Sequence, residues 1–539
     1  MKTSQSEQLS QDSQNSQSTS TQRKFYDRYS AALGGLLSLI APVAAARFRF
    51  GRDLYRGYVA GTATGPDQNF RPRLRGSADA DVKRGQPLTS ARCRDQYQNN
   101  SLIAGAVERI CTNVVRNGIY PQFQFRDRAA KLDRKANTAW EKLFRRWAIY
   151  CDNTGHDSFG SLQTLGHRHM WFDGGFLVHR VYDDSLPGIV PLRLELIEYN
   201  QLDTLIDGMQ TNGNIARRGI EFDSNGREIA FHVLENHPGD YIARGSFGKS
   251  RRLPAADIIH VWDREMISQY SGISWLHSVV MEGYRMDEFR HITQDTARAQ
   301  AIFAYFLRSA MPGFSLGPGV PAGGQTSPYS PASTGGSTDS ELNLNSTQVQ
   351  KLPQGTEVQA ISPTHPGDNY EPFVKDSQRW QSAGLGMSFE GFANNYTDAS
   401  YASSRSGSLE ERLSYQGQQQ FIEEKINRRV VAWFIEAAWL ANMQPVNMPG
   451  YARDPLAYHE QAVGQFPGWT WVDPQNDARA AAMLIDLTID TRTAQAAQRG
   501  QNFEDVVERQ IEEEEAMSRL YQLRAQRLAL TNPQEQNNV

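Results

Sequence analysis

Two short patterns match motifs that bind phosphate or carry a nucleophile, but neither stands in the context that its chemistry needs. Gly248-Lys249-Ser250 copies the end of a phosphate-binding loop, yet Ala243 occupies the place of the first glycine and no apolar strand leads into it. Gly313-Phe314-Ser315-Leu316-Gly317 matches the nucleophile elbow of hydrolases, which requires a strand before it and a helix after it. A stretch rich in Pro, Gly and Ser follows instead. Neither pattern predicts a catalytic site.

Candidate metal ligands are few and incomplete. His167 and His169 stand two residues apart, next to Trp171 and Asp173, which is half of a metal site that nothing nearby completes. The acidic run from Glu512 to Glu515 could attract cations, but a solvated helix face is the ordinary explanation for such a run. We therefore expect no metal, no cofactor and no enzymatic activity.

The charge balance limits how tightly the chain can bind nucleic acid. The 539 residues include 56 Lys and Arg against 60 Asp and Glu, a formal net charge of -4. Tight phosphate binding needs a strong basic excess, so any contact with DNA should be loose. Cys93, Cys111 and Cys151 are too few for a disulfide framework or a zinc quartet, and they suit a reducing compartment. We interpret them as small core residues.

The N-terminal region predicts little folded structure. Residues 1–24 are dominated by Ser and Gln, a composition that predicts a disordered tail. Residues 25–89 read as a basic arm, which is either solvated and extended or lies on an acidic surface or near nucleic acid. The apolar run 31–46 contains Pro42 and is too short to cross a bilayer comfortably, so we expect no membrane contact.

Residues 90–273 show the alternation of helix and strand patterns that is typical of an α+β domain. Two apolar stripes with helical spacing come first, and short alternating runs follow. Asn-Gly pairs at 212–213 and 225–226 predict tight turns, and residues 258–262 predict the last strand. The helical stripes consist of Leu102, Ala106, Ile110 and Val114, and of Trp140, Leu143, Phe144 and Trp147.

The sequence after residue 273 predicts a pair of helices, one that leads away from the α+β domain and one that returns to it. A helix of about 36 residues should start near Ser274 and end before Pro312. Residues 312–340 read as a flexible insertion, 349–362 as strand-like, and a helix should return from about Tyr370. Two helices with a small tip bury too little surface alone, so we expect their apolar faces to pack against neighbouring copies of the chain.

A polar, nearly uncharged loop at residues 388–407 comes next. Ser408 and Glu411 match a capping box, which predicts that a helix of about 35 residues begins there. The C-terminal part after Pro474 should be helical again, with an acidic helix at 504–515. The apolar face of the helix that begins at Ser408 includes Leu440. We expect the face to pack subunit against subunit through Ile422, Ile426, Val430 and Trp433.

Three separated segments carry a resemblance to a known family. They read IIHVWDREMISQYSGISWLHSVV, RWQSAGLGMSFEGFANNYTDASYASSRSG and WVDPQNDARAAAMLIDLTIDTRTAQAAQRGQNFEDVVER. In this order and spacing, they resemble the lambda-type portal proteins of tailed bacteriophages, over about residues 90–515. The resemblance implies an α+β, mainly helical portal fold that assembles into a ring, usually of twelve subunits, at one capsid vertex.

The resemblance also implies a division of the chain into the parts of a portal subunit. Residues 90–273 and 408–490 would form the wing, 274–310 and 370–387 the stem, 311–369 the clip, 388–407 the tunnel loop and 491–539 the crown. The implied partners are double-stranded DNA in the channel, the terminase large subunit, head-completion or adaptor proteins, and the major capsid and scaffolding proteins. The implied location is the virion, after assembly in the bacterial cytoplasm.

Within the tunnel loop we expect the side chains nearest to DNA. A conduit must let a polyanion slide, and a neutral polar loop suits that better than a basic groove would. The two tyrosines could equally pack between subunits, and the arginine should reach either phosphate or a neighbouring carboxylate. The candidates are Asn394, Asn395, Tyr396, Tyr401, Ser403, Ser404 and Arg405.

Two alternative classes of function remain at this point. A nuclease or ATPase of DNA packaging would need clustered carboxylates and an intact phosphate loop, and neither is present. A capsid or scaffolding protein would also assemble into large particles. The helices that lead out and back, with a polar loop after them, favour a portal over a shell protein.

Overall fold

The computed structural model describes residues 76–126, 131–239, 249–302, 305–309, 356–360 and 369–531. Contacts divide the chain into Met1–Gly76 and Ser77–Val539, and the fold below belongs to the second unit. The predicted tail 1–24, the apolar run 31–46, Gly248 and the insertion 312–340 with its nucleophile pattern lie outside the described residues. None of the described helices is long and apolar enough to cross a membrane.

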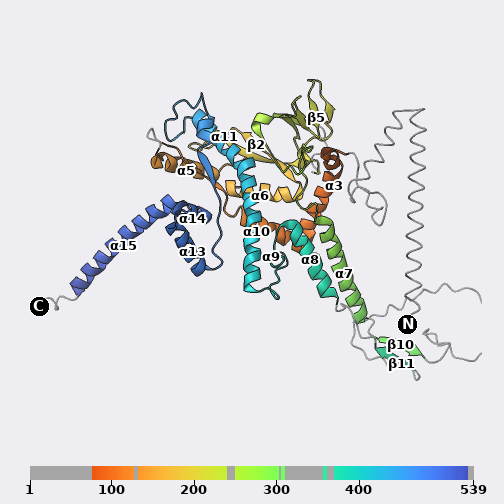
Figure 1. The fold of residues 1–539 in the computed structure, drawn as a ribbon. Coiled ribbons are helices and arrows are strands. Elements are labelled where there is room, and N and C mark those ends of the chain that lie inside the picture. Colours follow the sequence, from red (N-terminus) through yellow and green to blue (C-terminus); the bar gives the residue numbers. More distant parts are fainter. Residues whose placement is uncertain are drawn as a thin grey trace, which may run out of the picture. The chain divides into compact units, whose positions relative to one another are not determined.

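The first described element corrects the prediction of an extended arm. Residues 76–89 fall within the predicted arm, but helix α3 spans Ala78–Asn99, with Ser77 as its N-cap (Figure 1). The helix forms despite Pro87 because one face is buried, and that face carries Val82 and Cys93. Gln86, Ser90 and Gln96 lie on the same buried face, so its apolar periodicity is too weak to be recognised from the sequence.

Three helices and a small sheet contribute much of the main core, which later helices complete. Helices α4 (Ser101–Val114), α5 (Arg134–Ala148) and α6 (Phe159–Phe172) confirm the two predicted amphipathic helices and add a third. Strands β2 (Gly175–Val181), β3 (Arg193–Glu198) and β9 (Ile258–Trp262) form an antiparallel sheet in the order β3-β2-β9. The aromatic centre of this core consists of Trp140, Phe144, Trp147, Phe159 and Phe434.

A five-stranded antiparallel sheet forms a second, smaller core. The strands are β4 (Gly208–Met209), β5 (Ile215–Arg217), β6 (Ile220–Phe222), β7 (Glu228–Leu234) and β8 (Ser250–Pro254), in sequential order. Gly213 and Gly226 have φ of 82° and 77°, so both predicted Asn-Gly turns are confirmed. The α+β character predicted for residues 90–273 is therefore present.

The helices that lead out and back are shorter than predicted. Helix α7 spans Val280–Ile302, and β10 (Tyr305–Ser309) pairs antiparallel with β11 (Thr356–Ala360). Helix α8 (Tyr370–Leu385) returns from the predicted position. The first helix starts late because Ser274 forms a turn in which its Oγ donates to the Trp171 carbonyl. It also ends early, because a strand has begun by Tyr305.

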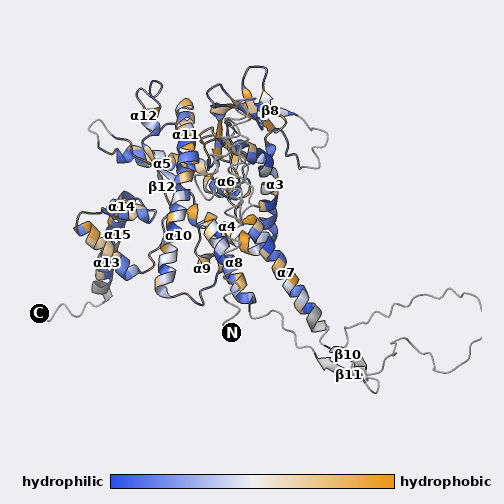
Figure 2. Cartoon of the chain, turned by 45° about the vertical axis from the view of Figure 1, so that its right-hand side comes forward, coloured by the Kyte–Doolittle hydropathy of each residue, from blue (hydrophilic) through white to orange (hydrophobic). Residues whose placement is uncertain are grey.

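Helices α7 and α8 contact each other through aromatic rings and one hydrogen bond. The Phe289 ring stacks on Tyr370 with a centroid distance of 5.8 Å, and Ser377 Oγ donates to Glu282 Oε1 at 2.9 Å. Trp380 and Tyr284 are exposed on these helices. Figure 2 shows hydrophobic residues interspersed with hydrophilic ones along α7.

The C-terminal part is helical, as predicted. A strand, β12 (Ala462–Gln465), pairs with β1 (Tyr120–Phe123), and α12 (Leu456–His459) precedes it. Helices α13 (Pro474–Asp486), α14 (Arg492–Gln498) and α15 (Phe503–Thr531) follow, and α15 contains the predicted acidic segment. No described residue of α13, α14 or α15 is buried.

Candidate functional site

The predicted loop 388–407 is partly helical. Helix α9 spans Phe389–Ala393, a loop covers residues 394–400, and α10 (Tyr401–Ile422) begins about two turns before the predicted Ser408 start. Ser400 is the true N-cap, because its Oγ accepts from Ser403 N at 3.2 Å while Ser403 Oγ accepts from Ser400 N at 3.0 Å. In a serine-rich segment several residues can cap a helix, so the pattern at Ser408 is misleading.

Neighbouring elements hold the loop 394–400 at both of its ends. Asn394 ends α9 in the left-handed conformation, with φ of 55°, and its Oδ1 accepts from Arg109 Nη2 at 3.3 Å. Lys375 Nζ of α8 donates to Asp398 Oδ2 at 2.9 Å. Glu411 of α10 accepts from the backbone N–H of Ser388, and burial raises the pKa of this carboxyl. The loop is therefore anchored to α4 and α8, and the helix α9 before it is anchored to α10.

The predicted DNA-proximal residues divide into two groups. The first group lies in the loop, where Asn394 and Tyr396 are exposed and Asn395 Oδ1 accepts from Thr397 N at 3.1 Å. The second group lies in the first turns of α10, where Tyr401 is exposed, Ser403 completes the capping box and Ser404 is half-buried. The structure brings Tyr401 together with Arg405 but keeps both in contact with their own chain.

Arg405 pairs with a carboxylate of the same chain. Its Nη2 lies 2.7 Å from Asp477 Oδ1, and its Nη1 lies 3.5 Å from the Tyr401 hydroxyl, which in turn lies 3.5 Å from Asp473 Oδ2. The hydrogen bond from Arg405 lowers the pKa of Asp477, and the same contact raises the pKa of Arg405. Sequence reasoning missed both aspartates, which are far from Arg405 along the chain; only the helix-start signal at Asp473-Pro474 was available.

The helix that carries the loop is anchored in the core of its own subunit. After α10 the chain continues through a π-helical segment, Glu423–Asn427, into α11 (Arg428–Leu440). Gln419 Nε2 donates to the carbonyls of Val114 and Pro467, and Glu423 Oε1 accepts from Gly464 N at 3.1 Å. These contacts tie α10 to α4 and to Pro467, and they tie the π-helical segment to strand β12.

The predicted subunit-packing face is buried inside the subunit. Ile422, Ile426, Val430 and Trp433 belong to the main core, in contact range of the chain's own helices and of β9. Leu440, at the end of the same predicted face, is 61% exposed. The periodicity correctly marked a buried face, but the expectation of packing between subunits is wrong for these four residues.

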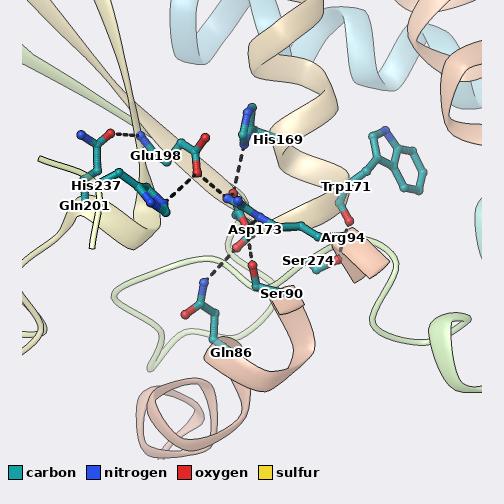
Figure 3. A network of polar contacts seen from close by, with 10 residues as sticks. All are labelled: Gln86, Ser90, Arg94, His169, Trp171, Asp173, Glu198, Gln201, His237 and Ser274. Atoms are coloured by element: carbon teal, nitrogen blue, oxygen red, sulfur yellow. Dashed lines mark hydrogen bonds and ion pairs between the residues drawn. The ribbon is translucent and has the colours of Figure 1, made fainter. Parts of the chain in front are cut away.

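The predicted half metal site is a network of hydrogen bonds and ion pairs around Asp173 (Figure 3). The Asp173 carboxylate accepts from Arg94 Nη2 at 2.6 Å and from Ser90 Oγ, and it contacts His169 Nδ1 at 3.0 Å. Burial opposes its ionisation, but these partners together hold its pKa below the usual value. Arg94 also binds Glu198, so the network joins α3, the end of α6 and β3.

The other residues with potential chemistry have structural roles. His167 is buried, with Nε2 2.8 Å from Gln418 Oε1 and Nδ1 3.2 Å from Cys111 Sγ. Burial raises the pKa of the Cys111 thiol to about 12, and all three cysteines are buried, as predicted. Lys249 and Ser250 lead into strand β8 and not into a helix. Within the described residues no cluster of His, Cys, Asp or Glu could hold a metal ion.

The sequence match assigns the class of protein. An α+β body, the helices α7 and α8 on either side of the antiparallel strand pair β10–β11, and a polar loop on a core-anchored helix agree with the portal subunit expected from the sequence. The family model for the lambda family of phage portal proteins matches residues 65–419. The chain therefore belongs to the lambda family of phage portal proteins.

Known phage proteins agree with this assignment. The chain is 26% identical over 438 residues to the probable portal protein of Halomonas phage phiHAP-1, covering 80% of each sequence. It is 20% identical to portal protein B of Escherichia phage lambda, covering 85% of this chain and 89% of the relative.

Among solved structures, the neck of the native gene transfer agent particle, computed with C12 symmetry, is similar at 12% identity and a TM-score of 0.41. This similarity covers 77% of this chain and 93% of the matched chain. The neck of the empty particle, computed with C6 symmetry, gives a TM-score of 0.44. The family assignment rests on the sequence matches.

Proposed function

We propose that twelve copies of the chain form a closed ring at one vertex of the capsid, and that double-stranded DNA passes through its centre during packaging and ejection. Membership of the portal family supports the connector role. The observation that carries the channel assignment is the loop 394–400, which is polar, exposed and held at the end of a helix that is itself anchored in the core.

The chemistry of the loop suits a sliding contact. Each phosphate that pairs with a fixed cation adds affinity, and hence resistance to movement, so a channel wall should offer hydrogen-bonding groups with few free cations. The loop contains the amides of Asn394 and Asn395 and the hydroxyl of Tyr396, while Asp398 is paired with Lys375. Loose, non-specific contact with DNA is the expected result.

The remaining partners follow from the same role. In this proposal residues 311–369 form the clip, which meets the terminase large subunit and later the head-completion or adaptor proteins. The wing contacts the major capsid and scaffolding proteins, and the finished protein is part of the virion after assembly in the bacterial cytoplasm. Exposed Tyr284 and Trp380 on α7 and α8 supply apolar area for packing between copies in the ring.

Imaging of the purified full-length protein tests the ring. We expect electron micrographs to show single closed rings with a central channel, because a chain with exposed apolar helices needs neighbouring copies to cover them. Multi-angle light scattering should give a mass near twelve times 60.6 kDa. Monomers at every protein concentration, or closed shells without a channel, would contradict the proposal and favour another structural protein of the phage.

A further inference from the structure

Two cations next to the loop 394–400, Arg405 and Lys375, are held by carboxylates of their own chain, while Arg109 donates to the amide oxygen of Asn394. Arg405 contacts Asp477, and Lys375 contacts both Glu371 at 3.0 Å and Asp398 at 2.9 Å. We propose that Asp477 is a positioning residue that withholds Arg405 from DNA, so that the start of α10 offers passing phosphates no free cation. This inference rests on the proposed function, in which this end of α10 faces the channel.

A backbone contact orients the Asp477 carboxylate independently of Arg405. Its Oδ2 accepts from the backbone N–H of Asp473 at 3.1 Å, which leaves Oδ1 for the guanidinium. Asp473 is the N-cap of α13, and its Oδ1 accepts from Asn476 N at 3.2 Å. Both carboxylates therefore sit at a helix N-terminus, where the helix dipole stabilises negative charge.

Arg405 is held from two sides. Asp477 binds Nη2, while the Tyr401 hydroxyl, itself in contact with Asp473, lies beside Nη1. The side chains of Arg405 and Asp477 are 32% and 20% exposed, so a phosphate could reach the guanidinium if the carboxylate were absent. The pair therefore acts on the availability of a cation and adds little to stability, as expected of a partly exposed ion pair.

Repetition around a ring makes the effect large. One released arginine per subunit would present a circle of cations, and each phosphate contact steepens the dependence of log affinity on log salt by about 0.9. Lys375 of α8 provides a second instance of the same arrangement. Two cations from different helices are thus paired with carboxylates, which leaves fewer cations for phosphate contacts.

A binding experiment with five variants of the full-length protein tests this inference. Asp477→Asn should release Arg405, while Arg405→Gln removes the cation and the double variant removes both partners. Asp486→Asn is the matched control, because it removes the same charge from the exposed C-terminal turn of α13. The probe is a fluorescent DNA duplex, titrated with each variant over a range of salt concentrations.

We expect Asp477→Asn to bind the duplex more tightly than the wild type at low salt. The slope of log affinity against log salt concentration should be steeper by about 0.9 for each arginine that reaches a phosphate. Arg405→Gln, the double variant and Asp486→Asn should bind like the wild type, and Asp477→Glu should restore wild-type binding. Duplex binding by Asp477→Asn that is the same as that of the wild type would overturn the inference. So would a double variant that binds as tightly as Asp477→Asn, since Arg405 would then not be the cause.

The inference and the proposed function fail in different ways. Rings without a central channel, or no rings, would contradict the proposed function whatever the binding result. Intact wild-type rings combined with unchanged binding of Asp477→Asn would contradict only the role of Asp477. Each variant is imaged first, so that a loss of assembly is recognised before binding is compared.

Discussion

Replacing Val430 with Asp should leave no soluble, folded subunit. Val430 is 0% exposed in the main core, and an unpaired carboxylate buried there costs several kcal/mol. The total stability of a domain is only about 5–15 kcal/mol, so this single change is a large fraction of it. Soluble yield and thermal unfolding followed by circular dichroism measure the effect.

Leu440→Asp is the matched control for this prediction. Leu440 lies on the same helix, α11, but is 61% exposed, so the new charge stays in water. The control variant should be soluble and unfold near the wild-type temperature. A soluble Val430→Asp subunit that unfolds normally but fails to form rings would mean that this face packs between subunits after all.

A double change in the loop, Tyr396→Lys with Thr397→Lys, should block DNA movement without blocking assembly. Both positions are exposed, so two lysines add charge at little cost in packing. In a ring of twelve they would place 24 cations around the channel, and the added phosphate contacts should hold DNA in place. We expect normal rings but at least a tenfold loss of infectious particles, on the order expected for several new phosphate contacts.

The same two lysines at Leu205 and Met209 form the control. These residues lie in or next to the five-stranded sheet and are 91% and 80% exposed, so the net charge changes equally at a distance from the loop. The control phage should yield normal titres. If the loop variant packages and ejects DNA like the wild type, the loop does not face DNA, and if the control is equally defective, added charge alone explains the loss.

Local patterns predicted much of the fold. The four-residue stripe in α4, the aromatic face of α5 and the Asn-Gly turns all depend on residues close together in the sequence, and all are confirmed. Helix α3 was missed because half of its buried face is polar, and Gln86 and Ser90 bond to groups that only the folded chain supplies. A hydrogen-bonded polar core has no signature in hydrophobic periodicity.

The candidate site was predictable as a segment but not in its contacts. The polar composition of 388–407 marked the loop, whereas the choice between Ser400 and Ser408 as N-cap depends on which serine the backbone can reach. The burial of Val430 was foreseen, but periodicity cannot distinguish a buried face inside one chain from a face between two chains. The Arg405–Asp477 pair joins positions 72 residues apart, so no local pattern reveals it.

The central claim is that residues 394–400 face the DNA in the channel, and photocrosslinking tests it most directly. A photoreactive phenylalanine analogue would replace Tyr396, which is 57% exposed, and in a second phage Leu205 as the control. Irradiation of DNA-filled particles should join the portal subunit to DNA from position 396 and not from position 205. Crosslinks from position 205 with none from position 396 would contradict the assignment of the loop to the channel.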